Sequence, residues 1–178
     1  KAIFEILKDM EKPYPMSRLL EGEVGSGKTI VAAAAMLAAV KAGFQTCVMA
    51  PTEILAKQHF ETLSKFLKPF DMTLKLIVGS TPEPEKKIMR EALKRGELSV
   101  VIGTHSLIQE NIGFQKLGLA VVDEQHRFGV KQREQLKSFG SPHLLSLTAT
   151  PIPRTLALTV YGDQDLSVLE EMPKGRQK

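Results

Sequence analysis

The chain has 178 residues, of which 43% are hydrophobic and 25% are charged, so it can bury one ordinary core and is not disordered. A single cysteine, Cys47, excludes an intramolecular disulfide framework and a cysteine-based zinc cluster. The longest apolar run, residues 30–40, is shorter than the ~18 residues that cross a bilayer. The net charge of +4 permits a polyanionic partner but does not require one.

Short apolar segments alternate with helical periods along the chain. Apolar residues at i, i+3, i+4 and i+7 predict an amphipathic helix over residues 3–10, which Pro13 and Pro15 end. Strands are predicted at residues 17–21, 44–50, 73–78, 98–102, 117–122, 143–147 and 166–169. Helices are predicted at residues 28–42, 52–67, 84–95 and 130–138, and again from about residue 153.

The connections between the predicted strands are too long for hairpins and contain helices. This order predicts parallel strands joined by right-handed crossovers. We therefore expect an α/β fold of three layers with an open, mainly parallel sheet. Ligands of such sheets bind at the carboxyl ends of the strands.

Residues 22–29, GEVGSGKT, match the phosphate-binding pattern G-x-x-x-x-G-K-[ST] at every fixed position. The glycines allow successive N–H groups to point at one anion, and the following helix adds its partial positive charge. Lys28, expected to be exposed on the loop, would bind the β- and γ-phosphates, and the Thr29 hydroxyl would bind Mg²⁺. The predicted cofactors are ATP and Mg²⁺, held by Gly22, Glu23, Val24, Gly25, Ser26, Gly27, Lys28 and Thr29. The alternative, a glycine-rich turn that happens to contain Lys-Thr, is disfavoured by the strand–loop–helix context.

A second candidate motif, Asp123-Glu124-Gln125-His126, follows the apolar strand predicted at 117–122. Asp123 could hold the Mg²⁺ through water, and Glu124 could orient or deprotonate the attacking water. Taken alone, the acidic pair could equally be the start of a helix, where carboxylates are favoured. Together with a complete phosphate loop, it indicates nucleotide hydrolysis.

In this combination the sequence resembles the first RecA-like domain of superfamily 2 helicases and translocases. Motif I corresponds to residues 22–29, Ia to 51–56, Ib to 103–105, II to 123–126 and III to 148–150. The resemblance implies catalytic roles for Lys28, Asp123, Glu124, Gln125 and His126. It implies DNA contacts from Pro51, Thr52, Glu53, Gly103, Thr104 and His105, and coupling through Thr148, Ala149 and Thr150.

Within this superfamily, residues 49–56, 123–130, 148–155, 161–168 and 172–176 are similar to the RecG family of bacterial DNA translocases. This resemblance implies an ATP-driven motor on branched double-stranded DNA, acting in repair and recombination in the bacterial cytoplasm, without a membrane. Transcription-repair coupling factors are the alternative. They share the segment HRFGV but usually have Glu where Gln125 stands.

The predicted RecA-like domain spans residues 1–172, and residues 173–178 would begin a linker to a second RecA-like domain. The resemblance implies partners in that second domain, with its arginine finger, and in a wedge domain. The chain would then hold half of an ATP site and half of a DNA track, and would be nearly inactive alone. Two alternatives from other classes remain: a P-loop kinase or small-substrate ATPase, and a nucleotide-binding interaction module without catalysis.

Three features have two interpretations each. His105 could contact the DNA backbone or be a polar turn residue after its strand. Thr52 could cap the following helix and also contact phosphate. The basic residues Lys86, Lys87, Arg90, Lys94 and Arg95 could face DNA, although a solvated helix face is favoured.

Overall fold

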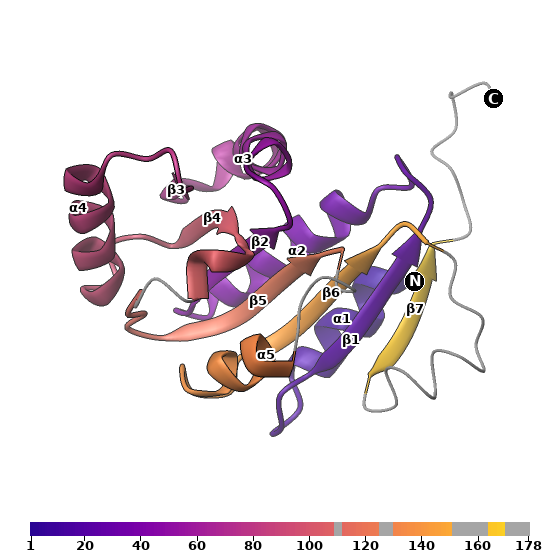
Figure 1. Ribbon diagram of the computed structural model, residues 1–178. Helices are drawn as coiled ribbons and strands as arrows, with labels where there is room; N and C mark the ends of the chain where they lie inside the picture. The colour runs from indigo at the N-terminus through magenta and orange to yellow at the C-terminus, as the bar shows by residue number, and fades with distance from the viewer. Residues whose placement is uncertain (109–111, 125–129, 151–163, 170–178) are drawn as a thin grey trace.

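The computed structural model describes residues 1–108, 112–124, 130–150 and 164–169 (Figure 1). These residues contain a seven-stranded sheet of order β3-β4-β2-β5-β6-β1-β7, in which every pairing is parallel. The strands are β1 (Ser17–Gly22), β2 (Gln45–Ala50), β3 (Leu74–Ile77), β4 (Val100–Thr104), β5 (Leu117–Asp123), β6 (His143–Thr148) and β7 (Asp165–Leu169).

One of the described helices precedes the first strand, and the others lie in the connections between strands. The helices are α1 (Ala2–Met10), α2 (Lys28–Lys41), α3 (Glu53–Leu67), α4 (Glu83–Lys94) and α5 (Val130–Lys137), with 3₁₀ turns η1 (Lys68–Phe70) and η2 (His105–Ile108). The predicted strands and helices are confirmed, with ends displaced by a residue or two. The helix predicted from about residue 153 lies outside the described residues. None of the described helices has the length and apolar character needed to cross a membrane.

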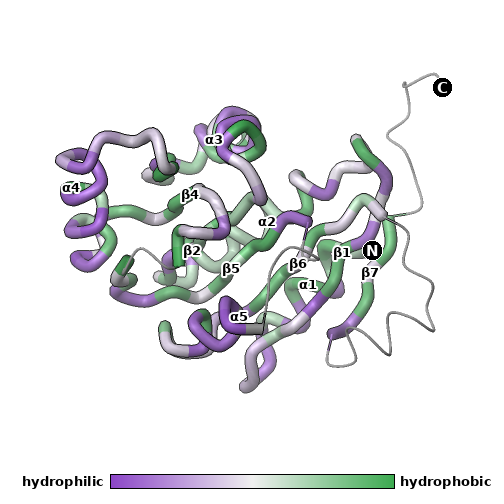
Figure 2. The backbone as a smooth tube through the Cα atoms, in the orientation of Figure 1, coloured by the Kyte–Doolittle hydropathy of each residue, from purple (hydrophilic) through white to green (hydrophobic). Residues whose placement is uncertain are grey.

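The sheet separates two apolar cores, so the predicted three-layer arrangement is confirmed. Helices α1, α2 and α3 cover one face, and α4, η2 and α5 cover the other (Figure 1). Strand β2 shows the alternation: Val48 and Ala50 belong to the first core, and Cys47 and Met49 to the second. In Figure 2 the apolar strands lie between helices with polar outer faces. Burial on both faces explains the continuous apolar runs of the central strands.

A buried ion pair fixes the strand that leads into the phosphate loop. Arg18 on β1 donates to the Asp9 carboxylate on α1 and, at 2.8 Å, to the Ser167 hydroxyl on β7. Burial raises the pKa of Asp9, but hydrogen bonds from Lys12 and Arg18 outweigh it and hold the pKa below its ordinary value. The pair therefore holds α1, β1 and β7 together at one side of the sheet.

The register brings the carboxyl ends of five strands to one edge of the sheet. Glu21 pairs with Thr148, so β1 and β6 end level, and Asp123 pairs with Leu147, so β5 ends beside them. On the other side of β5, β2 and β4 end together, because Ala50 pairs with Thr104. The segments that follow these strands contain all five predicted motifs.

The first prediction concerns Gly103 of β4, which pairs with Met49 on one side and Ile77 on the other. A Cβ atom at Gly103 would lie 2.4 Å from the Ile77 carbonyl oxygen, a backbone atom that cannot move alone. We expect Gly103→Ala to lower the free energy of unfolding by about 1–3 kcal/mol, as overpacking of a core does. Chemical denaturation measures this change in the free energy of unfolding.

Gly113→Ala is the matched control, because its Cβ would meet only the side chain of Lys94, at 2.9 Å, which is flexible. Equal stability of the two variants would contradict the steric role of Gly103.

Candidate nucleotide site

The loop between β1 and α2 has the geometry of an anion-binding loop. Gly25 and Gly27 have φ values of 84° and 95°, in the left-handed region that favours glycine. Gly22 is required for a different reason, since a Cβ there would lie 2.5 Å from Ser26 Oγ. Glycine is therefore required at each of these three positions, at two by backbone conformation and at one by lack of space.

An unpaired donor and a helix N-terminus lie where the phosphates are predicted to bind. Gly27 caps α2 without a side-chain hydrogen bond, and the start of the helix carries a partial positive charge. The hydroxyl of Ser26 is buried and has no hydrogen-bond partner. A buried hydroxyl without a partner, next to a helix N-terminus without a side-chain cap, fits a phosphate group.

Lys28 lies folded against its own loop. Its Nζ donates to the backbone carbonyl of Gly22 and, at 2.9 Å, to that of Glu23. Burial lowers the pKa of the Lys28 ammonium, while the charges of Asp123 and Glu124 act in the opposite direction. The expectation that Lys28 is exposed was wrong: the side chain is half-buried, because the loop wraps around it.

The acidic pair lies at the carboxyl end of β5, as predicted. Asp123 Oδ1 accepts from the Glu124 N–H at 3.1 Å, and the same N–H lies 3.0 Å from the Leu147 carbonyl oxygen on β6. Glu124 has a φ of 50°, a left-handed conformation that costs a non-glycine residue about 1–3 kcal/mol. The two hydrogen bonds of the Glu124 N–H, to Asp123 and to Leu147, help to hold this conformation. Gln125 and His126 lie outside the described residues.

Strand β6 lies between the phosphate-loop strand and the acidic strand, and carries the predicted coupling motif at its end. The buried Thr148 hydroxyl lies 2.9 Å from the Thr150 hydroxyl and accepts from the Thr150 N–H at 3.2 Å. The half-buried Ala149 lies between them. This turn places the threonines between the two halves of the predicted nucleotide site.

The donor set fits Mg²⁺ bound with a nucleotide better than a metal held by protein alone. The described residues contain no group of three or more His, Cys, Asp or Glu side chains that could hold a metal. Mg²⁺ normally takes one or two protein oxygens together with phosphates and waters. Thr29 and Asp123, at the two sides of the site, would supply these.

The first predicted DNA segment, Pro51–Glu53, joins β2 to α3. Thr52 caps α3, with its hydroxyl accepting from the Leu55 N–H at 3.3 Å, so the capping prediction is confirmed. Glu53 is held elsewhere: its carboxylate accepts from the Ser80 N–H at 3.1 Å and the Ser80 hydroxyl at 2.8 Å. Those hydrogen bonds lower the pKa of Glu53, which keeps a negative charge that would repel phosphate. A DNA contact by its side chain is therefore not favoured.

The second predicted DNA segment, Gly103–His105, points largely inward. Gly103 is buried within β4, and His105 is 9% exposed, with its Nε2 3.2 Å from the Asp123 carbonyl oxygen. This placement favours a role for His105 inside the protein, at the end of β5. Thr104 is half-exposed, and its hydroxyl lies 2.7 Å from that of Ser106.

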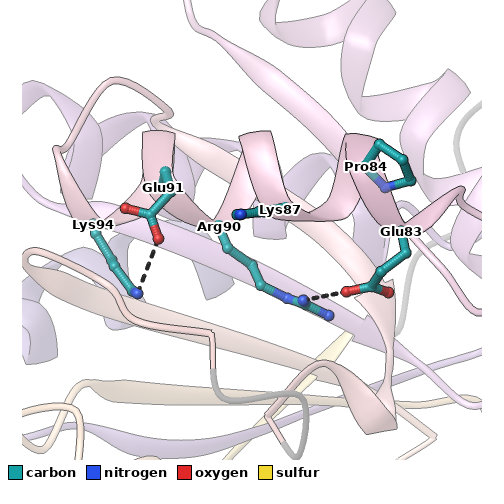
Figure 3. A pocket seen from close by; sticks show the side chains of 6 residues that line it. All are labelled: Glu83, Pro84, Lys87, Arg90, Glu91 and Lys94. Carbon is teal, nitrogen blue, oxygen red and sulfur yellow. Dashed lines mark hydrogen bonds and ion pairs between the residues drawn. The ribbon is translucent and has the colours of Figure 1, made fainter.

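The basic helix α4 lies at the opposite side of the molecule from β7 (Figure 1). Figure 3 shows that two of its basic side chains are paired with acids on the same helix: Arg90 with Glu83 at 2.6 Å, and Lys94 with Glu91 at 3.1 Å. Pairing within the helix reduces the positive field that DNA would meet. The solvated-face interpretation is the better supported one.

The sequence analysis missed His59, which adds a contact to the acidic motif. His59 lies on α3, and its Nε2 is 2.7 Å from Asp123 Oδ2. The inward stripe of α3 consists of Ala56, Leu63 and Leu67. His59 stands three residues after Ala56 and four before Leu63, so it was the polar residue on a buried helix face.

Comparison with known proteins agrees with this geometry. A sequence model described as "DEAD/DEAH box helicase" matches residues 1–159. The chain belongs to the DEAD/DEAH box helicase family. It is 51% identical to the ATP-dependent DNA helicase RecG of Synechocystis sp., over 99% of this chain and 21% of that protein. The RecG proteins of Aquifex aeolicus and Bacillus subtilis are 50% and 49% identical, over all of this chain and 23% and 26% of theirs.

Comparison with solved structures also finds a RecG protein. The structure of RecG bound to a three-way DNA junction superposes with a TM-score of 0.86 at 45% identity, covering 99% of this chain and 24% of that one. The helicase MrfA bound to DNA and AMPPNP has a TM-score of 0.71 at 18% identity, which shows the fold alone. The predicted resemblance to the RecG family is confirmed, and the chain spans about a quarter of the RecG relatives.

The second prediction tests the phosphate loop of this DEAD/DEAH domain. Lys28→Ala removes a cation that would make charge-assisted bonds to phosphate, each contributing roughly 1.5–3 kcal/mol. We expect nucleotide affinity to fall at least about tenfold, to below detection, with little change in melting temperature because Lys28 is not part of either core. Titration with a fluorescent ATP analogue and thermal unfolding measure both quantities.

Lys87→Ala on α4 is the charge-matched control, since Lys87 is exposed and far from the loop. Unchanged affinity in Lys28→Ala would mean that the phosphates bind elsewhere.

Proposed function

We propose that this domain is the ATP-binding motor half of an ATP-driven translocase that remodels branched double-stranded DNA in repair and recombination. The observation that carries the proposal is the shared carboxyl edge of the sheet. There the phosphate loop, Asp123–Glu124 and Thr148–Thr150 adjoin one another, and the segments after β2 and β4 end beside them. We further propose that the protein works in the bacterial cytoplasm.

Each residue of the edge has a role in this proposal. Mg²⁺ bound with ATP would neutralise the charge that develops on the phosphates. The loop N–H groups and the Lys28 ammonium would hold the phosphates, and the Thr29 hydroxyl and Asp123 would hold the metal. Glu124, whose backbone is left-handed, would accept the proton of the attacking water. Gln125, His126 and the Thr148–Thr150 turn couple this chemistry to DNA.

The DNA would run along the segments that follow β2 and β4. Pro51, Thr52 and Thr104 are the contacts that the described geometry favours, since Thr52 is exposed and Thr104 half-exposed. The positive end of the α3 helix dipole adds a favourable place for a phosphate. Branched DNA as the substrate rests on the RecG relatives, of which one is solved on a three-way junction.

Other functions fit these residues less well. A P-loop kinase or small-substrate ATPase would leave the resemblance of the segments after β2, β4 and β6 to helicase motifs without a reason. A nucleotide-binding module without catalysis would not need the strained Glu124 beside Asp123. Transcription-repair coupling factors share the motor chemistry, and the identity to RecG proteins supports the RecG assignment over them.

The third prediction tests the general base. Glu124→Gln keeps the shape of the side chain and removes the proton acceptor, a loss worth roughly 10²–10⁴-fold in rate. We expect normal ATP binding and a fall in turnover of that size, measured in a chain that includes a second RecA-like domain. Glu61→Gln on the exposed face of α3 is the control. Near-normal hydrolysis by Glu124→Gln would show that another group handles the attacking water.

The fourth prediction compares residues 1–178 with a chain extended through a second RecA-like domain. An arginine finger from that domain would be worth ~10³–10⁵ in rate, so the short chain should bind Mg²⁺-nucleotide weakly and hydrolyse near background. Forked DNA should stimulate the extended chain more than linear duplex or RNA does, and should hardly affect the short one. Steady-state ATPase assays with each nucleic acid measure this.

Two results would contradict the proposal. Robust DNA-stimulated turnover by residues 1–178 alone would indicate a self-contained ATPase. No DNA stimulation of the extended chain would favour a kinase or a small-substrate ATPase.

A further inference from the structure

The contact between His59 and Asp123 joins two segments that are 64 residues apart in the chain. The two side chains are each 14% exposed, and the Nε2–Oδ2 distance is 2.7 Å. The phosphate-loop and acidic motifs do not require this contact. It comes from α3, the helix that begins at the predicted DNA segment.

The chemistry of the contact fixes which atom donates. An ionised carboxylate can only accept, so the His59 ring carries its proton on Nε2 and donates to Asp123. The other carboxylate oxygen accepts from the Glu124 N–H at 3.1 Å. Both oxygens are therefore held, one by α3 and one by the turn after β5, and the rotation of the carboxylate is fixed. Each oxygen still has acceptor capacity for a metal-bound water.

The helix that carries His59 is itself firmly seated. Its N-terminus is capped by Thr52 and tied to the β3–α4 connection through the hydrogen bonds from Ser80 to Glu53. Its inward stripe, Ala56, Leu63 and Leu67, is fully buried against the sheet. The His59 ring is thus held in a defined place from which a carboxylate can be oriented.

We propose that His59 is a positioning residue that orients the Asp123 carboxylate for Mg²⁺-bound nucleotide. This inference rests on the proposed function, because it concerns the metal side of the same site. Hydrogen-bond partners of metal-binding groups typically contribute 10–100-fold to metal affinity. His59 therefore sets how tightly the protein holds the nucleotide with Mg²⁺ and has little effect on the nucleotide without it.

Two amide variants of His59 distinguish its role as a hydrogen-bond donor to Asp123 from a role in filling space. In His59→Gln the side-chain amide can place its nitrogen near the position of Nε2, whereas the shorter amide of His59→Asn cannot reach Asp123. Both are polar; Asn has about the helix propensity of His, and Gln has a somewhat higher one. Gln58→Ala, an exposed neighbour on the same helix, is the control for α3 itself.

The experiment titrates the protein with a fluorescent ADP analogue, once in Mg²⁺ and once in EDTA, and records melting temperatures. We expect His59→Asn to weaken binding by about 10–100-fold in Mg²⁺ only, and to need more Mg²⁺ for half-saturation. His59→Gln and Gln58→Ala should behave like the unaltered protein. This pattern, which burial alone would not produce, supports the positioning role.

The other outcomes are distinguishable. If the unaltered protein shows no Mg²⁺-dependent gain in affinity, the proposed function fails. If that gain is present and His59→Asn keeps it, the positioning role is overturned and the proposed function stands. If His59→Asn loses affinity equally with and without Mg²⁺, or if His59→Gln fails to restore it, His59 is structural only and the inference is again wrong.

Discussion

Parallel pairing of the strands is the constraint on which the site depends. Because all seven strands run the same way, their carboxyl ends lie at one edge, and residues far apart in the chain meet there. The registers of Glu21 with Thr148 and of Asp123 with Leu147 set the level of that edge. A slip of one residue in β5 would reverse the faces of its side chains and remove Asp123 from the site.

The edge combines groups that are costly to hold together without a ligand. Lys28 is half-buried with a lowered pKa, the Ser26 hydroxyl is buried without a partner, and Glu124 is held in a left-handed conformation. Strain and unpaired polar groups cluster at functional sites, where a ligand offsets their cost. The buried pair of Arg18 on β1 and Asp9 on α1 differs from these groups, because its two charges form hydrogen bonds with each other and need no ligand.

Helix α3 connects the two activities expected of the domain. It begins at Thr52, in the segment after β2, and within two turns it reaches Asp123 through His59. In η2, directly after β4, His105 contacts the backbone of the same aspartate. The end of β5 is therefore supported from the side where DNA is proposed to bind, as well as from β6.

The sequence by itself determined the fold class, the order of elements, the phosphate loop and the acidic motif. These depend on local patterns: apolar runs, helical periodicity, and glycines at fixed spacing. The tertiary structure alone decided the contacts between distant segments. His59 contacts Asp123. Position 103 requires glycine because a Cβ atom there would collide with the Ile77 carbonyl oxygen. Glu53 is hydrogen-bonded to Ser80. No local pattern encodes such pairs, because sheet order and register place them together.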